Sequence, residues 1–296
     1  MNRAVTPPAP VLVLGAVASV QSGAAVAIKL FPETGPVGAL LLRLGLSALL
    51  LLAIARPRWS GRSRHDVILV VAYGVALAAM NGTFYEALDR IPLGVAVTVE
   101  FVGPLAVAVG GSRRRLDVVW VVLAATGVVL LTSGGGNGID LVGVAWAAIA
   151  GAFWAAYILL TQRVGRAFPG ATGLAIGLTI GAVCVLPFGI ATAGTHLVRP
   201  GVLVRGAAVA LLSSAVPYSL ELFALRRMRA SVFGVLMSLE PAMAAVSGLL
   251  FLGQHLKVRE WVAIGCVMTA SIGATRSAKT VAPIEPGATP VEAAAA

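Results

Sequence analysis

Ten apolar segments, each about 20 residues long, constrain the fold of this chain more than any other feature of its sequence. They cover residues 10–30, 36–56, 66–85, 91–111, 117–134, 140–161, 172–192, 201–225, 231–252 and 258–275. A helix needs about 20 mostly apolar residues to cross the hydrocarbon core of a bilayer. Each segment is therefore predicted to be a transmembrane helix, and the chain an all-α membrane protein with ten of them.

The composition excludes a water-soluble fold. Of the 296 residues, 58% are hydrophobic and only 11% are charged, and the mean hydropathy is +0.94. A soluble globular domain carries about 25% charged residues. This chain has too few charges to cover a water-facing surface, so the lipid bilayer is its expected surroundings.

The net charge of +10 raises the question of nucleic-acid binding. The arginines, however, gather in short loops between apolar segments. These loop arginines are Arg56, Arg58, Arg62, Arg64, Arg113, Arg114, Arg115, Arg226, Arg227 and Arg229. Such clusters are typical of cytoplasmic loops, and they place both termini in the cytoplasm. We therefore predict an N-in, C-in topology and no nucleic-acid partner.

The two halves of the chain resemble each other. When the segment around Pro104 is laid on the segment around Pro241 without a gap, Arg90 also aligns with Arg227. The predicted units are a cytoplasmic tail (1–9), a first five-helix repeat (10–134), a second five-helix repeat (140–275) and a disordered cytoplasmic tail (279–296). Because five helices is an odd number, the repeats have opposite orientations. Inverted repeats of this kind build many secondary transporters, with the binding site near the midplane between them.

Each repeat carries a glutamate inside an apolar segment, close to a proline. Glu100 lies in "VTVEFVGPLAVAV" and Glu240 in "VLMSLEPAMAAVSG". A charged side chain at the centre of a bilayer costs at least about 2.5–3.5 kcal/mol, so both are expected to face a shared interior cavity. The alternative is structural: a protonated or arginine-paired glutamate that only holds helices together.

The two prolines are expected to break their helices. Proline cannot donate a hydrogen bond to the carbonyl four residues earlier, so Pro104 frees the carbonyl of Glu100, and Pro241 frees that of Met237. Irregular backbone inside a membrane is tolerated where it lines a cavity. A carboxylate beside a free carbonyl suits a proton or the ammonium group of a substrate.

Further polar side chains inside the apolar segments complete the predicted substrate and proton site. They are Arg43, Gln21, Asn81, Tyr85, Tyr157, Tyr218 and Glu221. Arg43 could bind a substrate carboxylate through two hydrogen bonds, or pair with an acid. The uncharged groups could equally bond neighbouring helices, and Glu221 could reach the membrane surface. No cysteine and histidine cluster has metal-binding spacing, so neither a metal nor a cofactor is expected.

Several longer strings resemble a known family. "YEALDRIPLGVAVTVEFVGPLAVAV" and "VPYSLELFALRRMRASVFGVLMSLEPAMAAVSGLLFLGQ" resemble the two halves of EamA-domain proteins of the drug/metabolite transporter superfamily, and most of all its RhtA-type threonine/homoserine exporter branch. The resemblance implies ten helices in two inverted repeats, in the inner membrane of a bacterium. It also implies export of small amino acids by exchange with protons. One departure is Gln254, where the family commonly has a glutamate.

The expected function is therefore proton antiport of a small amino acid by alternating access. One alternative is an EamA-family exporter of another metabolite or a drug. A membrane enzyme would need a nucleophile, a base or a metal cluster at one membrane face, and the sequence contains no such set. A sensor or scaffold is the remaining alternative. The sequence leaves a homodimer open.

Overall fold

The computed structural model describes residues 7–57, 62–110, 116–132, 139–225, 227–228 and 230–277, and within these ranges it contains only helices and their connections. Arg58, the arginines at 113–115, Arg226, Arg229 and the tail at 279–296 lie outside them. The helices are α1 (Ala9–Ile28), α2 (Phe31–Ala55), α3 (Arg64–Leu88), α4 (Leu93–Glu100), α5 (Val102–Gly110), α6 (Leu116–Thr132), α7 (Leu141–Ala167), α8 (Thr172–Ala193), η1 (Gly194–Val198), α9 (Pro200–Ala210), η2 (Leu211–Ala215), α10 (Val216–Leu225), α11 (Ala230–Met237), α12 (Glu240–Leu252) and α13 (Val258–Ser277).

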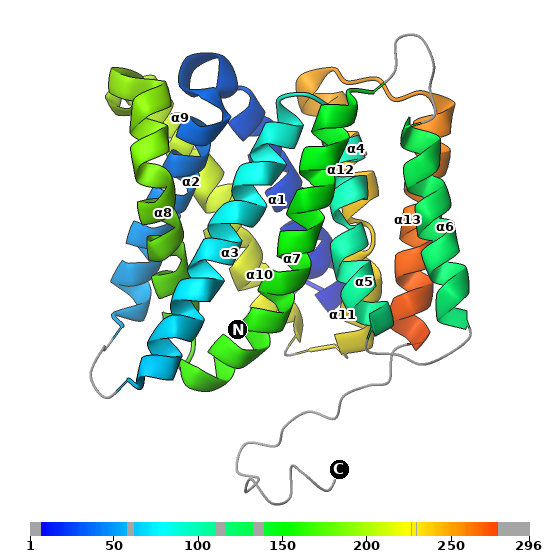
Figure 1. The fold of residues 1–296 in the computed structure, drawn as a ribbon, viewed down its shortest axis with the longest axis horizontal. Coiled ribbons are helices and arrows are strands. Elements are labelled where there is room, and N and C mark those ends of the chain that lie inside the picture. Colours follow the sequence, from blue (N-terminus) through cyan, green and yellow to red (C-terminus); the bar gives the residue numbers. More distant parts are fainter. Residues whose placement is uncertain are drawn as a thin grey trace, which may run out of the picture.

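Apart from η1, the helices correspond to the ten predicted segments. They outnumber the segments because three segments are each built from more than one helix. The fourth contains α4 and α5, the eighth contains α9, η2 and α10, and the ninth contains α11 and α12. Figure 1 shows the helices side by side in one bundle, with α8 and α9 at one end and α6 and α13 at the other. The all-α prediction is confirmed.

Eight of the described segments are long and apolar enough to cross a membrane. The helices of the fifth and tenth predicted segments, α6 and α13, are not among these eight. The apolar part of α6 is shorter, running from Asp117 to Leu131. The helix α13 carries Arg259, Glu260 and Arg276. These two helices pack against each other, as Figure 1 shows.

The second helix begins earlier than predicted. We expected it to start at residue 36, but α2 starts at Phe31 and contains a kink. Gly35 has φ 66°, in the left-handed region that glycine adopts without steric cost. Pro36 follows it, so the helical turn before the kink and the long helix after it meet at an angle.

Two segments break close to their glutamates. Glu100 is the last residue of α4, and Glu240 is the first residue of α12, which follows α11 after a two-residue interruption. Pro104 lies inside α5, one turn after its break, and Pro241 is the second residue of α12. Neither proline can donate a backbone hydrogen bond to the preceding turn, because proline has no N–H group.

The broken segment α4–α5 passes through the interior of the bundle. All eight residues of α4 are buried. Two glycines allow α5 to cross α7 at close range: Gly103 lies against the carbonyl of Gly151, and a Cβ added at Gly151 would lie 2.7 Å from the carbonyl oxygen of Glu100. The path of the backbone at Glu100 therefore depends on the absence of side chains at this crossing.

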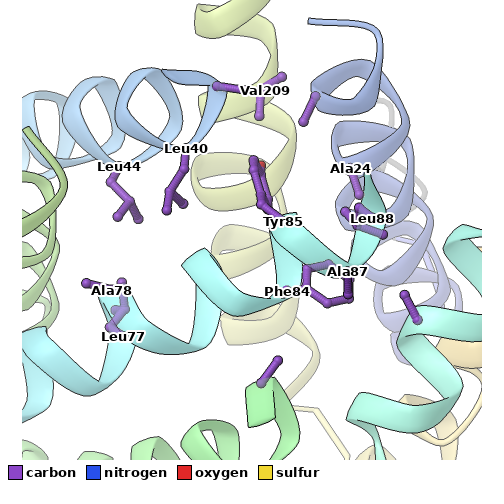
Figure 2. Packing of buried hydrophobic residues seen from close by; sticks show 14 of the residues in the cluster. Ala24, Leu40, Leu44, Leu77, Ala78, Phe84, Tyr85, Ala87, Leu88 and Val209 are labelled. Carbon is purple, nitrogen blue, oxygen red and sulfur yellow. The ribbon is translucent and has the colours of Figure 1, made fainter. Parts of the chain in front are cut away.

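A second buried contact fixes α3 against its neighbours. Figure 2 shows Tyr85 of α3 among Leu40 of α2, Ala24 of α1 and Val209 of α9. The tyrosine is 1% exposed, and its ring centroid lies 5.7 Å from that of Phe31. The ring therefore packs where four helices meet.

We predict that Gly151→Ala destabilises the protein. The new Cβ would collide with the backbone of Glu100, which cannot move aside as a flexible side chain could. Overpacking of this kind typically costs about 1–3 kcal/mol. The measurement is the thermal unfolding of detergent-solubilised protein.

Gly165→Ala is the matched control for this prediction. Gly165 lies on the same helix α7, with no atom within 4 Å of an added Cβ, and alanine favours helix over glycine. The control should be neutral or slightly stabilising. Equal melting temperatures for the two variants would show that the Gly103–Gly151 crossing does not limit stability.

Candidate transport site

A cavity of about 260 Å³ lies inside the bundle and collects most of the polar side chains that the sequence singled out. Its charged lining residues are Arg43, Glu100, Glu221 and Glu240. Its uncharged polar lining residues are Gln21, Asn81, Tyr157, Ser213 and Ser214. Since a water molecule occupies about 30 Å³ in the liquid, the volume corresponds to roughly eight or nine waters. A small zwitterionic metabolite fits this size and this mixture of groups.

The two helix breaks supply the central carboxyl groups. Glu100 at the end of α4 and Glu240 at the start of α12 are each 7% exposed, and both line the cavity. They are close enough for the charge of one to act on the other, and Arg43 acts on Glu100 in the same way. A charge removed from water is costly unless it is paired. The cavity therefore suits a cationic partner for these carboxyl groups.

A third carboxyl group, that of Glu221, completes the acidic part of the cavity. It lies on α10, and its charge acts on Glu240. The sequence had left open whether Glu221 reaches the membrane surface, and the structure places it in the cavity lining. Three carboxyl groups thus share one cavity with one lining guanidinium group.

Arg43 is held against Tyr85, which was predicted as a binding residue. The Arg43 Nη1 donates a hydrogen bond of 3.5 Å to the Tyr85 hydroxyl, and the guanidinium lies 5.7 Å from the centre of the ring. Tyr85 itself is not among the residues that line the cavity. Its position is behind Arg43, where it orients the guanidinium group.

The remaining predicted residues occupy different positions. The Asn81 amide lines the cavity and donates to the carbonyl of Leu77 at 2.8 Å. Tyr157 also lines it, and its ring stacks on that of Tyr73 at 5.2 Å. The side chain of Tyr218 lies outside the described residues, although the adjacent Pro217 lines the cavity.

The sequence analysis missed a pair of serines. Ser213 and Ser214 belong to η2, a single π-helical turn between α9 and α10, and both line the cavity. Such turns are rare and occur frequently at functional sites. The hydroxyls of Ser214 and Ser47 are 2.8 Å apart. A serine pair in an apolar segment was the available signal, but the turn that aims it inward was not visible in the sequence.

Trp154 is another residue at the site that the sequence analysis did not single out. It lines the cavity, and its ring meets that of Phe101 edge to face at 5.5 Å. Phe101 is the residue at the break between α4 and α5. Trp154 therefore joins the wall of the cavity to the break beside Glu100.

Gln254, where the resembled family commonly has a glutamate, has a structural role. Its Oε1 accepts a hydrogen bond of 3.0 Å from the N–H of Leu93, the first residue of α4. The first N–H groups of a helix have no partner within the helix, and Gln254 satisfies one of them. It does not line the cavity.

Among the described residues, no group of three or more His, Cys, Asp or Glu side chains is placed to hold a metal ion. Two ion pairs lie away from the cavity. One joins Arg90 to Asp140 at 3.3 Å, and the other joins Arg205 to Glu33 at 2.6 Å.

Comparisons with known proteins agree with a transport fold. Residues 141–276 match the model of the EamA-like transporter family. The chain is 47% identical over 268 residues to the threonine/homoserine exporter RhtA of Escherichia coli K12, covering 90% of each chain. It is 46% identical over 270 residues to the exporter of the same name from Salmonella typhimurium LT2, covering 90% of this chain and 91% of the relative.

Two more distant matches cover most of the chain. An uncharacterized transporter of Bacillus subtilis, YwfM, is 28% identical over 244 residues, covering 78% of this chain and 80% of its own. A solved protein crystal structure superposes with a TM-score of 0.62 at 17% identity, over 91% of this chain and 97% of its own. That likeness shows the fold alone. The identity to RhtA over nearly the whole chain shows the family: this protein is a multi-pass membrane transporter, not an enzyme, and it belongs to the EamA-like transporter family.

Proposed function

We propose that this protein exports threonine and homoserine across the cytoplasmic membrane of a bacterium, in exchange for protons. The observation that carries the proposal is one cavity lined by Arg43, Glu100, Glu221 and Glu240 in a chain 47% identical to RhtA exporters. An amino acid carries one positive and one negative group. The cavity offers partners for both.

The chemistry of exchange follows from these partners. In the loaded state, the substrate ammonium group pairs with the carboxylate of Glu100 or Glu240, and Arg43 donates two hydrogen bonds to the substrate carboxylate. In the unloaded state, a proton on the glutamate replaces the ammonium group. A buried carboxylate without a counter-charge is costly, so the glutamate alternates between these two partners.

The architecture we propose is a pair of inverted five-helix repeats, α1 to α6 and α7 to α13. The packing of helices supports it, because the main contacts of one half have counterparts in the other half. The contact of α3 with α7 corresponds to that of α9 and α10 with α1, and the contact of α4 and α5 with α7 to that of α11 and α12 with α1. The pairs α2 with α8 and α6 with α13 are their own counterparts.

The distribution of charged side chains supports an orientation with both termini in the cytoplasm. Arg56, Arg62, Arg64, Arg163, Arg166 and Arg276 lie where α2, α7 and α13 end and α3 begins. Figure 1 shows these helix ends at the bottom of the view, whereas the α1–α2 turn lies at the top. Positively charged loops face the cytoplasm in most membrane proteins.

Alternating access would use the two broken segments. Each break leaves a backbone joint beside a cavity glutamate, so rocking of one repeat against the other can expose the cavity to either side. In this proposal the substrate cavity stays fixed, and the helix breaks that allow the movement lie directly beside it.

The topology is tested with reporter fusions in bacteria. Alkaline phosphatase is active only outside the cytoplasm. Green fluorescent protein fluoresces only inside it, because the protein does not become fluorescent when it is exported in unfolded form. We expect fluorescence from a fusion after Ser277 and phosphatase activity from a fusion after Val198. The reverse pattern would reject the N-in, C-in orientation.

Transport itself is tested with purified protein in liposomes. We impose a proton gradient across the liposome membrane. We expect labelled threonine and homoserine to cross the membrane in the direction opposite to the proton flow. Glu100→Gln should abolish gradient-driven flux, because the amide can neither bind nor release a proton at neutral pH. Glu86→Gln is the matched control. Glu86 is half-buried on α3, outside the cavity lining, and its loss should leave flux intact.

Two results would contradict the proposal in different ways. Gradient-driven flux at the wild-type rate in Glu100→Gln would remove Glu100 from proton coupling. Absence of threonine and homoserine flux in folded wild-type protein would remove the substrate assignment, and a metabolite screen in the same liposomes would then identify the transported compound.

A further inference from the structure

One wall of the cavity is polar but uncharged, and its polar groups have no partners among the described residues. It is formed by Gln21 of α1 and Ser213 of η2, which are 3% and 6% exposed. The Gln21 Oε1 is buried and makes no hydrogen bond within the part of the chain that the structure describes. The hydroxyl of Ser213 likewise makes none to the described residues. More than nine-tenths of each side chain is removed from solvent.

The neighbours of these two residues are satisfied, which makes the pair unusual. The Ser19 hydroxyl, on the same helix as Gln21, donates to the carbonyl of Leu212 at 2.7 Å, and the hydroxyls of Ser47 and Ser214 are 2.8 Å apart. Most buried polar groups in proteins have a hydrogen-bond partner, and the exceptions call for an explanation. Gln21 is such an exception in the lining of this cavity, and a ligand in the cavity would supply the missing partner.

The backbone places both residues in the lining of the same cavity. The π-helical turn places Ser213 in the cavity wall. Its hydroxyl lies against Gly23 of α1, where a Cβ would collide with it.

Glu100, Glu240 and Arg43 suit the ammonium and carboxylate groups that every amino acid shares. The neutral wall is therefore the part of the lining that remains for the substrate side chain. An amide oxygen accepts one hydrogen bond from a hydroxyl, and a serine hydroxyl can donate or accept another. We propose that Gln21 and Ser213 form a hydroxyl subsite, which selects amino acids bearing a side-chain hydroxyl over the same amino acids without it. This inference rests on the proposed function and specifies its substrate class.

The selectivity has a direct physical origin. A substrate without the hydroxyl would fill the cavity, exclude water and leave both polar groups unpaired. A site built to hydrogen-bond a substrate hydroxyl rejects the analogue that lacks it far more strongly than an apolar pocket rejects a missing methylene. With two partners, we expect a preference of roughly 10- to 100-fold.

A single analogue tests the subsite, because 2-aminobutyrate is both threonine and homoserine without the hydroxyl. In liposomes, we expect the wild-type kcat/KM for threonine to exceed that for 2-aminobutyrate roughly 10- to 100-fold. Ser213→Ala and Gln21→Met should each reduce this ratio toward one, through a loss of threonine transport with little change for 2-aminobutyrate.

Ser219→Ala is the matched control. Ser219 lies on α10, is exposed, and bonds the carbonyl of Ala215 in the preceding turn, so the ratio should stay at the wild-type value. Equal losses for threonine and 2-aminobutyrate in both cavity variants would overturn the subsite while leaving the proposed function intact. Folded wild-type protein that transports neither threonine nor homoserine would overturn both.

Discussion

Backbone hydrogen bonding inside a membrane is the constraint on which the rest of this structure depends. Lipid offers no partner to a free N–H or carbonyl group, so a broken helix survives only where protein surrounds it or a water-filled cavity adjoins it. The α4–α5 segment meets this condition, because α4 is buried on all sides and α5 crosses α7 at paired glycines. The α11–α12 segment breaks where the hydroxyls of Ser238 and Ser271 lie 2.7 Å apart. Both breaks sit beside a cavity glutamate.

The site follows from these breaks. Helix ends at Glu100 and Glu240 bring two carboxyl groups to one cavity, and the π-helical turn in the eighth segment brings Ser213 and Ser214 to the same space. Arg43 supplies the lining guanidinium group, oriented by Tyr85 behind it. The irregular backbone of three segments and the polar lining of one cavity are thus parts of a single arrangement. Its ionic groups suit what all amino acids share, and its neutral wall suits a side-chain hydroxyl.

Most of the fold could be predicted from the sequence. An apolar segment of bilayer length can satisfy all its backbone hydrogen bonds within itself only as a helix. Glu100, Glu240 and Arg43 could be singled out because a charge in an apolar segment is costly and needs a cavity or a partner. Tyr85 could not be separated from the lining residues, since its side of α3 depends on tertiary packing. Ser213 and Ser214 were missed because one π-helical turn leaves no periodic pattern. The early start of α2 was missed because Gly35–Pro36 reads as a helix boundary but forms a kink.

The central claim is that one cavity glutamate holds either a proton or the ammonium group of the substrate. The most direct test is to add threonine to purified protein in weakly buffered solution near neutral pH and to measure the protons released per threonine bound. The account predicts proton release by the wild-type protein and a smaller release by Glu100→Gln or Glu240→Gln at the same occupancy. Threonine binding without any proton release would contradict exchange at these glutamates and would indicate that the substrate binds without displacing a proton.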